Sequence, residues 1–363
     1  MIAIIIAGAS ALVLSILGTP LYIRILVRKQ YGQFIRDDGP TSHSTKRGTP
    51  TMGGVAIILA TLLGFGLTHL VLWDVPSVSA LLVLFLMAGL GVVGFLDDYL
   101  KISRQRSLGL TARAKLLGQF LVATTFAVLA LTLRDADGLT PASSRISFVR
   151  DIPWLDLAFG GTILGIILFA LWSNFLVAAW SNGVNLTDGL DGLATGATIL
   201  FAGTYVLICF WQWRQKCPAG FEFTSCYTNP DPLGTAVVAS AIVGACIGFL
   251  WWNTSPAKIF MGDTGSLALG GALAGLTVVS RTELLGALIG GLFVIISVSV
   301  ILQVASFKLT GKRIFRMAPL QHHFELKGWG EVTIVVRFWI VAGILALAGL
   351  GLFYLDALPR LTS

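Results

Sequence analysis

Ten long runs of apolar residues divide this chain, and they limit its possible folds more than any other feature. A helix needs about 20 apolar residues to cross the hydrocarbon core of a bilayer, and most of the runs approach that length. A transmembrane β-barrel would show short segments of alternating polarity instead. The pattern therefore predicts an all-α polytopic membrane protein, one domain over residues 1–363, with about ten spans near 2–23, 52–72, 78–96, 116–133, 158–180, 194–213, 235–252, 267–280, 284–305 and 333–355.

Composition excludes the main alternative, a soluble protein with one large core. Only 12% of the residues are charged and 55% are hydrophobic, whereas a soluble domain carries about 25% charged residues. The apolar excess extends over the whole length of the chain, so it cannot belong to a single core.

The distribution of basic residues predicts the orientation of the spans. The eighth run, 267–280, is short, and a re-entrant hairpin is the alternative there. With ten spans, one side carries 18 of the 25 Lys and Arg residues in its loops and adjoining helix ends. The positive-inside rule makes that side cytoplasmic and places both termini outside. Removing the eighth span would move the basic loop 306–332 outside, so ten spans are preferred.

Two cysteines share the loop 214–234, which this topology places on the outer side. Cys217 and Cys226 can form a disulfide if that face is oxidising, and two unbridged thiols are the alternative. We favour the disulfide.

Acidic residues on the predicted cytoplasmic side gather in short motifs at span ends. Asp97 and Asp98 end an apolar run in GFLDDYLK, where adjacent carboxylates repel each other unless a cation or Lys101 relieves the repulsion. Asp263 lies between glycines in FMGDTGS. A solvated helix end explains the first motif on its own. A helix N-cap at Asp263 or Ser266 explains the second.

The glycine-rich stretch SNGVNLTDGLDGLATG, residues 181–196, holds two asparagines and two aspartates without a nearby Lys or Arg. Asn182 and Asn185 offer amides, and Asp188 and Asp191 are three apart, so a helical turn would put both carboxylates on one face. A polar turn with an aspartate capping the next helix is the alternative. It explains one aspartate but not the cluster.

Two basic motifs lie on the same side. TKRGTPTMGG contains Lys46 and opens the second span, where a helix anchor is the alternative reading. MAPLQHHFELKGW contains His322 and His323, a pair that is a weak signal for metal binding and fits phosphate contact or acid–base work equally well. Carboxylates recruit Mg²⁺, and Mg²⁺ with Lys and Arg neutralises phosphates. Together the motifs predict Mg²⁺-dependent phosphoryl transfer at a membrane surface, with a lipid as the acceptor.

In this order, the motifs resemble those of the phospho-N-acetylmuramoyl-pentapeptide-transferase family, within the polyprenyl-phosphate N-acetylhexosamine-1-phosphate transferase superfamily. GFLDDYLK, NLTDGLDGLA and FMGDTGS mark the superfamily, while TKRGTPTMGG and APLQHHFELKGW point to this branch. The branch usually has three consecutive histidines where this chain has Gln321, His322 and His323. The family fold is a ten-helix membrane protein, often a homodimer, with a cytoplasmic active site.

The resemblance implies a reaction in peptidoglycan synthesis. Phospho-MurNAc-pentapeptide passes from UDP-MurNAc-pentapeptide to undecaprenyl phosphate, which gives lipid I and UMP. The implied cofactor is Mg²⁺, the implied location is the bacterial plasma membrane, and no nucleic acid partner is expected.

Residue roles follow from the same resemblance. It implies that Asp263 is the Mg²⁺ ligand, that Asp97 and Asp98 lie near the metal and the lipid phosphate, and that Asp188 shapes the catalytic centre. His322 and His323 would contact phosphates or sugar of the substrate. The implied substrate-binding residues are Lys46, Thr51, Lys101, Lys115, Asn182, Asn185, Gly189, Leu190, Asp191, Asn253 and Phe260.

Alternatives remain for the mechanism and for the function. We favour direct attack with Asp98 as the base, and a two-step route through an aspartate nucleophile is the rival. A relative that uses UDP-GlcNAc is the nearest alternative enzyme. A transporter is the alternative class, but transporters place key charges near the bilayer midplane, whereas these lie at span ends.

Overall fold

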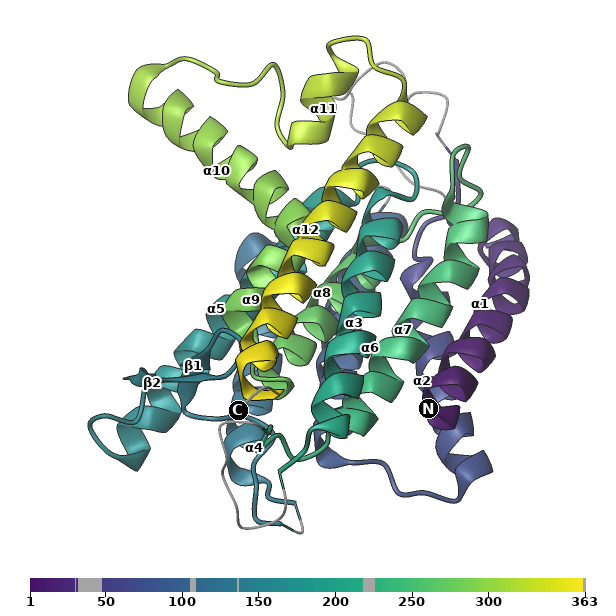
Figure 1. The fold of residues 1–363 in the computed structure, drawn as a ribbon. Coiled ribbons are helices and arrows are strands. Elements are labelled where there is room, and N and C mark those ends of the chain that lie inside the picture. The colour runs from purple at the N-terminus through teal and green to yellow at the C-terminus, as the bar shows by residue number, and fades with distance from the viewer. Residues whose placement is uncertain (30, 32–47, 105–108, 136, 218–225, 362–363) are drawn as a thin grey trace.

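Long helices that run side by side make up most of the molecule (Figure 1). The structure is a computed structural model that describes residues 1–29, 31, 48–104, 109–135, 137–217 and 226–361. In this part of the chain the elements are α1 (Ile2–Arg28), α2 (Gly54–Leu72), α3 (Val78–Ser103), α4 (Ala112–Thr132), β1 (Arg145–Ser147), β2 (Asp151–Asp156), α5 (Thr162–Thr187), α6 (Leu193–Arg214), α7 (Pro232–Asn253), α8 (Gly262–Val279), α9 (Glu283–Ile289), α10 (Gly291–Thr310), α11 (Leu320–Glu325) and α12 (Glu331–Leu361).

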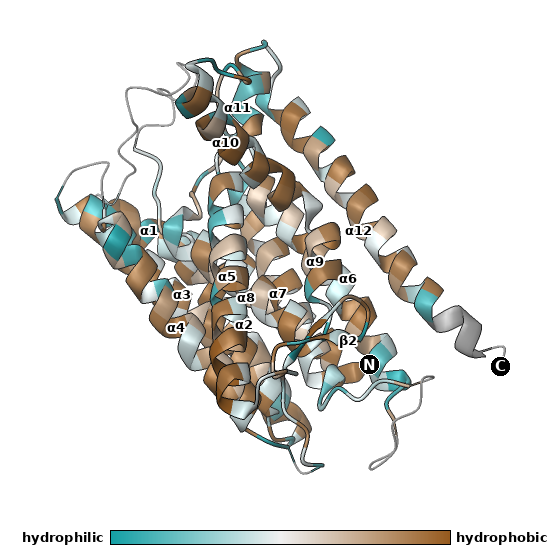
Figure 2. Cartoon of the chain, turned by 90° about the vertical axis from the view of Figure 1, so that its left-hand side faces the viewer, coloured by the Kyte–Doolittle hydropathy of each residue, from teal (hydrophilic) through white to brown (hydrophobic). Residues whose placement is uncertain are grey.

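Within the described residues, nine helices are long and apolar enough to cross a membrane: α1 to α7, α10 and α12. Many of their large apolar side chains are exposed. The hydropathy colouring in Figure 2 shows hydrophobic residues along most of these helices. Such a surface fits lipid rather than water. The prediction of an all-α polytopic membrane protein is confirmed.

The short eighth run forms α8, which lies inside the bundle. Every residue from Thr264 to Val279 is buried, mainly against α3 and α5. Because protein surrounds this helix, it does not need the apolar content of a helix that faces lipid. This fits the absence of α8 from the nine described helices that are long and apolar enough to cross a membrane.

The predicted continuous span 284–305 is wrong, because the structure divides it into two helices. α9 ends at Ile289 and α10 begins at Gly291. A side chain at Gly290 would come within 2.4 Å of the Trp180 ring, so the break lies where the chain passes close to α5. Beyond the break, α10 leans away from the bundle (Figure 1).

Other boundaries also differ from the predictions. α3 continues seven residues past the predicted end at 96, which places the whole acidic motif on a helix. α5 begins at Thr162 rather than 158, because the antiparallel hairpin β1–β2 precedes it. The apolar pattern did not predict this hairpin.

The disulfide prediction is confirmed. Cys217 and Cys226 are bonded, with their Cα atoms 5.0 Å apart. Figure 1 shows the hairpin and both ends of the chain at one end of the bundle, and α11 at the opposite end.

Candidate active site

Three carboxylates converge at the end of the bundle near α11. Asp97 and Asp98 lie in the last two turns of α3, and Asp263 lies in the first turn of α8. One oxygen of each lies within 4.8 Å of the others. Asp97 and Asp98 are both 3% exposed. Three acidic groups this close and this shielded repel one another strongly unless cations offset their charge.

Two lysines supply part of that positive charge. Lys101 Nζ lies 2.6 Å from Asp97 Oδ2, 3.7 Å from Asp98 Oδ1 and 3.0 Å from Asp263 Oδ2. Lys115 Nζ, from the first turn of α4, lies 2.8 Å from Asp263 Oδ2. Lys101 is therefore a partner of the pair on α3, as the alternative reading of that motif proposed. The solvated helix end of that reading is wrong, because both carboxylates are buried.

Asp98 also holds the N-terminus of α8. Its carboxylate accepts hydrogen bonds from the backbone N–H of Asp263 at 3.2 Å and of Thr264 at 2.8 Å, and from Thr264 Oγ1 at 2.7 Å. No side chain of α8 itself makes the cap. The interpretation of Asp263 or Ser266 as the N-cap is therefore wrong, since α3 supplies the capping carboxylate.

Glycines allow the helices to approach closely enough for this arrangement. A Cβ at Gly94 would lie 2.1 Å from the carbonyl oxygen of Asp263, and one at Gly54 would lie 2.0 Å from the nitrogen of Gly265. Any side chain at Gly54 or Gly94 would therefore separate α2 or α3 from the start of α8.

The TKRGTPTMGG motif is paired with the FMGDTGS motif through the main chain. Gly53 N–H donates to Phe260 O at 2.8 Å, and Phe260 N–H donates to Pro50 O at 2.8 Å. Thr51 is buried in this junction, and its Oγ1 lies 3.0 Å from the position a Cβ of Gly262 would take. Lys46 lies outside the described residues.

The two asparagines predicted on α5 have different surroundings. Asn185 Nδ2 donates to Asp263 Oδ1 at 2.7 Å and to Ser266 Oγ at 2.8 Å. Asn182 Nδ2 donates to the carbonyl of Ala178, one turn earlier on its own helix. Of the two, Asn185 is bonded to the acidic cluster.

Asp188 and Asp191 do not share a helical face, because α5 ends at Thr187 and residues 188–192 form a loop. Asp188 lies beside the acidic cluster. Its pKa is well above the usual range, because burial and the negative charges of Asp263 and Asp98 disfavour the ionised form. The capping interpretation is wrong as well, since the N-cap of α6 is Gly192 and no side chain caps it.

Asp191 instead lies against the loop that follows α7. Its Oδ2 accepts from Ala257 N–H at 3.0 Å, and its own N–H donates to Glu331 Oε1 at 2.9 Å. Asn253 braces the same loop, since it donates to Ile259 O and accepts from Thr195 Oγ1, both at 2.9 Å. Asp191 and Asn253 therefore fix the loop 254–259 in place.

The remaining predicted residues of this region form its inner lining. Leu190 is 3% exposed, while Gly189 and Phe260 are half-buried. Gly189 lies beside α11, where a Cβ would meet Gln321 Nε2 at 2.9 Å and His322 Nε2 at 3.0 Å.

The two histidines on α11 face different neighbours. His322 Nδ1 lies 2.6 Å from Glu325 Oε2, which leaves Nε2 directed at Gly189. His323 Nδ1 accepts from the backbone N–H of Arg316 at 3.1 Å. Desolvation, with the nearby charges of Lys327 and Arg316, lowers the pKa of His323. His322 therefore belongs to the wall formed by the 188–192 loop, and His323 to the loop before α11.

Gln321 occupies the position of the first histidine of the family motif. It is fully buried, and its Nε2 donates to Leu186 O at 2.8 Å, at the end of α5. This bond connects α11 to the glycine-rich loop without a titratable group.

The sequence analysis assigned no role to three residues of this network: Thr264, Glu325 and Glu331. Glu325 follows His322 by three residues on a helix, a spacing that could have indicated the pair. Glu331 lies 140 residues from the Asp191 N–H that it accepts, so no local pattern could have indicated it.

The fold and the site define the chain as an integral membrane transferase. The model of Glycosyl transferase family 4 matches residues 80–281, which include all three carboxylates of the cluster. Residues 46–58 match the Phospho-N-acetylmuramoyl-pentapeptide-transferase signature 1. The chain belongs to the phospho-N-acetylmuramoyl-pentapeptide-transferase family.

Relatives of that name match over nearly the whole length. The chain is 67% identical to the one from Kineococcus radiotolerans, over 97% of this chain and 98% of that protein. It is 63% identical to the one from Arthrobacter sp. (strain FB24), over 98% and 99%, and 60% identical to the one from Streptomyces avermitilis, over 97% of each.

Proposed function

We propose that this chain transfers phospho-MurNAc-pentapeptide from UDP-MurNAc-pentapeptide to undecaprenyl phosphate, which gives lipid I and UMP for peptidoglycan synthesis. The observation that carries the proposal is the convergence of Asp97, Asp98 and Asp263 with Lys101 and Lys115 at one end of a membrane-spanning bundle. Family membership supports the identity of the substrates.

The carboxylates fit the Mg²⁺ that the sequence implies. Mg²⁺ prefers hard oxygen ligands and is usually held by one or two carboxylates together with substrate phosphates. Asp263 is the candidate ligand. Among the described residues its carboxylate accepts only from side chains, whereas Asp97 and Asp98 also accept from backbone N–H groups. Asp97 lies beside Asp263. When bound, Mg²⁺ would neutralise charge on the phosphates.

The two lysines suit the substrate phosphates. Each Nζ forms an ion pair with Asp263 in this structure. A lysine ammonium carries three donors on a flexible stem, so each could turn toward a phosphate that enters the cluster. In this proposal Lys101 and Lys115 orient the pyrophosphate for attack and stabilise the charge that builds on it.

Direct attack by the acceptor phosphate needs little proton removal. A phosphate monoester has its second pKa near 6 and is largely dianionic at neutral pH. The sequence analysis favours Asp98 as the base, but its oxygens accept three hydrogen bonds from the start of α8. This arrangement suits the positioning of Asp263 better than proton abstraction. We therefore propose direct attack in which Asp98 mainly positions Asp263.

The wall formed by residues 188–192, the loop 254–259 and α11 is the candidate nucleotide site. Asp191, Leu190 and Phe260 would contact the nucleoside, with Asn253 holding the loop behind them. His322, oriented by Glu325, would contact phosphate or sugar through Nε2.

We further propose that residues 1–363 act as one membrane domain, as a homodimer in the bacterial plasma membrane, without a nucleic acid partner. The site end of the bundle carries the predicted cytoplasmic loops, whose excess of Lys and Arg supports a cytoplasmic active site.

The test is UMP release by the purified protein given UDP-MurNAc-pentapeptide, undecaprenyl phosphate and Mg²⁺. We expect activity that EDTA removes and that Asp263→Asn lowers at least about 10³-fold. Asp74→Asn, in an exposed loop at the other end of the bundle, is the matched control and should keep full activity.

Two further measurements distinguish the alternatives. Turnover of UDP-GlcNAc instead of the muramoyl substrate would assign the chain to a different branch. A radiolabelled phospho-aspartyl enzyme, trapped in the absence of acceptor, would establish the two-step route and refute direct attack.

A further inference from the structure

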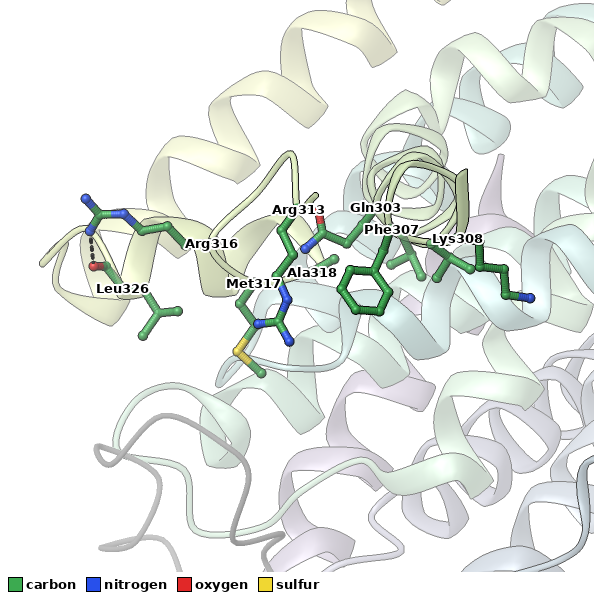
Figure 3. Close-up of a pocket in the computed structure, with 10 residues that line it drawn as sticks. Gln303, Phe307, Lys308, Arg313, Arg316, Met317, Ala318 and Leu326 are labelled. Carbon is green, nitrogen blue, oxygen red and sulfur yellow. Dashed lines mark hydrogen bonds between the residues drawn. The ribbon is translucent and has the colours of Figure 1, made fainter. Parts of the chain in front are cut away.

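A pocket outside the acidic cluster lies between α10 and the chain segment that leads to α11. Its volume is about 580 Å³. One side is the apolar face of α10, with Val300, Val304 and Phe307. The other side is the segment 313–318, together with Leu326 after α11. Figure 3 shows these side chains around the opening.

Three cationic residues surround this apolar interior. Lys308 extends at one end of the pocket, Arg316 at the other, and Arg313 lies between Phe307 and Met317 (Figure 3). Among the described residues, none of the three has a carboxylate within 4.0 Å, whereas Lys101 and Lys115 are both ion-paired. Within the described chain, the pocket therefore offers positive charge without a paired carboxylate.

Hydrogen bonds hold the cationic segment in place. Gln303 Oε1 accepts from the N–H of Ile314 and of Phe315, at 3.0 and 2.9 Å, and Gln303 Nε2 donates to Phe315 O at 2.9 Å. Arg316 Nη1 donates to Leu326 O at 2.6 Å, which closes the end of the pocket toward α11. A segment fixed in this way presents its charges in a defined position.

The position of the pocket along α10 indicates the kind of ligand. α10 is a candidate membrane span, and Ile301 and Val304 are 64% and 47% exposed. The basic residues begin at Lys308, two residues before the helix ends. The pocket therefore spans the boundary between hydrocarbon and polar headgroups, where Lys and Arg side chains meet lipid phosphates.

We propose that this pocket binds an anionic phospholipid. The phosphate would contact Arg313, Lys308 would add positive charge at the end of the pocket, and an acyl chain would follow the apolar face of α10 at Val300, Val304 and Phe307. Phosphatidylglycerol is the probe for this chemistry.

The reacting lipid is a different occupant. His322, on α11, faces Gly189 and the nucleotide wall. Arg316 lines the pocket, and its backbone N–H donates to His323 Nδ1. None of the lining residues hydrogen-bonds or ion-pairs with Asp97, Asp98 or Asp263 in the described chain. Within the described residues, the pocket therefore has no direct bond to the acidic cluster.

The test measures binding of radiolabelled phosphatidylglycerol to the full-length protein in detergent micelles, with phosphatidylcholine as the zwitterionic comparison. We expect the double variant Lys308→Gln/Arg313→Gln to bind phosphatidylglycerol at least about 10-fold more weakly than the unchanged protein. The matched control is Lys312→Gln/Lys327→Gln, which removes the same charge from neighbouring positions that do not line the pocket. It should bind as the unchanged protein does.

Three results would overturn the proposal. The first is equal binding of phosphatidylcholine, and the second is an equal loss in the control variant. The third is a rise in the KM for undecaprenyl phosphate that matches the loss of phosphatidylglycerol binding, which would assign the pocket to the acceptor. UMP release with saturating substrates shows that each variant is folded. Loss of lipid binding and loss of the proposed enzymatic function are therefore measured separately.

Discussion

The two ends of the bundle both bury charged groups, but they arrange them in opposite ways. At the hairpin end, three carboxylates each have a separate partner: Ser147 donates to Glu283, Arg281 pairs with Asp151 and Arg150 pairs with Asp356. At the α11 end, Asp97, Asp98 and Asp263 crowd together. The carboxylates of the hairpin end are therefore dispersed, whereas those of the α11 end concentrate negative charge where a cation can bind. We infer that the first arrangement serves stability and the second serves binding and chemistry.

The largest expected effect separates the two ends by activity. Lys101 contacts all three carboxylates of the cluster, so Lys101→Met should lower kcat/KM for UDP-MurNAc-pentapeptide by about 10² to 10³. The measurement is UMP release, with the exposed Lys327→Met as control. A loss smaller than about threefold would mean that the crowded cluster is not the reaction centre.

Added Mg²⁺ should stabilise the protein through the α11 end. A ligand at about 100 times its Kd stabilises the folded state by about 2.7 kcal/mol, so we expect the apparent Tm of EDTA-treated protein to rise by roughly 5 °C. Asp263→Asn should remove most of this rise, and Asp156→Asn on the hairpin should keep it. An equal rise in Asp263→Asn would place the cation elsewhere.

Removal of a hydrogen bond at the hairpin end should affect stability alone. Ser147 donates to the buried Glu283 through both its N–H and its hydroxyl. Ser147→Ala should therefore cost about 1–3 kcal/mol of unfolding free energy, measured by thermal denaturation. Ser143→Ala, in the same segment, is the control. UMP release below half that of the unchanged protein would contradict the division between the two ends.

The smallest expected effect is the pH response of His323 on α11. His323 accepts the Arg316 N–H through Nδ1, and burial together with Lys327 and Arg316 lowers its pKa. The stabilising bond is therefore present above the ordinary histidine pKa of about 6.5 and is lost as the pH falls through the lower folded pKa.

NMR of ¹³C-labelled histidine measures that pKa directly, because the chain has only four histidines. His323→Gln assigns its resonance. A pKa for His323 at or above 6.5 would show that the contact with the Arg316 N–H does not persist in solution.

The sequence predicted most of the helices because lipid imposes a minimum length of apolar residues on each span. It missed the break at Gly290, since the apolar run continues through this position, and the close approach of Gly290 to Trp180 is visible only in the folded chain. It missed the hairpin because Asp151–Asp156 is short and mixed in polarity.

The sequence indicated which residues belong to the site better than it indicated the hydrogen bonds between them. The motifs identified Asp97, Asp98, Asp263, Lys101 and Lys115, which lie together. The sequence could not predict that Asp98 caps α8, because Asp98 and Thr264 are 166 positions apart in the chain. Long-range hydrogen bonds of this kind depend on how helices pack, which local sequence patterns do not encode.

The glycine contacts around the start of α8 bear on how readily the site can change. Every substitution at Gly94 or Gly54 adds a side chain where backbone atoms already lie about 2 Å away. Variants at these positions would push apart the helices that hold Asp263. Both glycines are buried. Resistance to an inhibitor of this site would therefore have to arise at residues outside this junction.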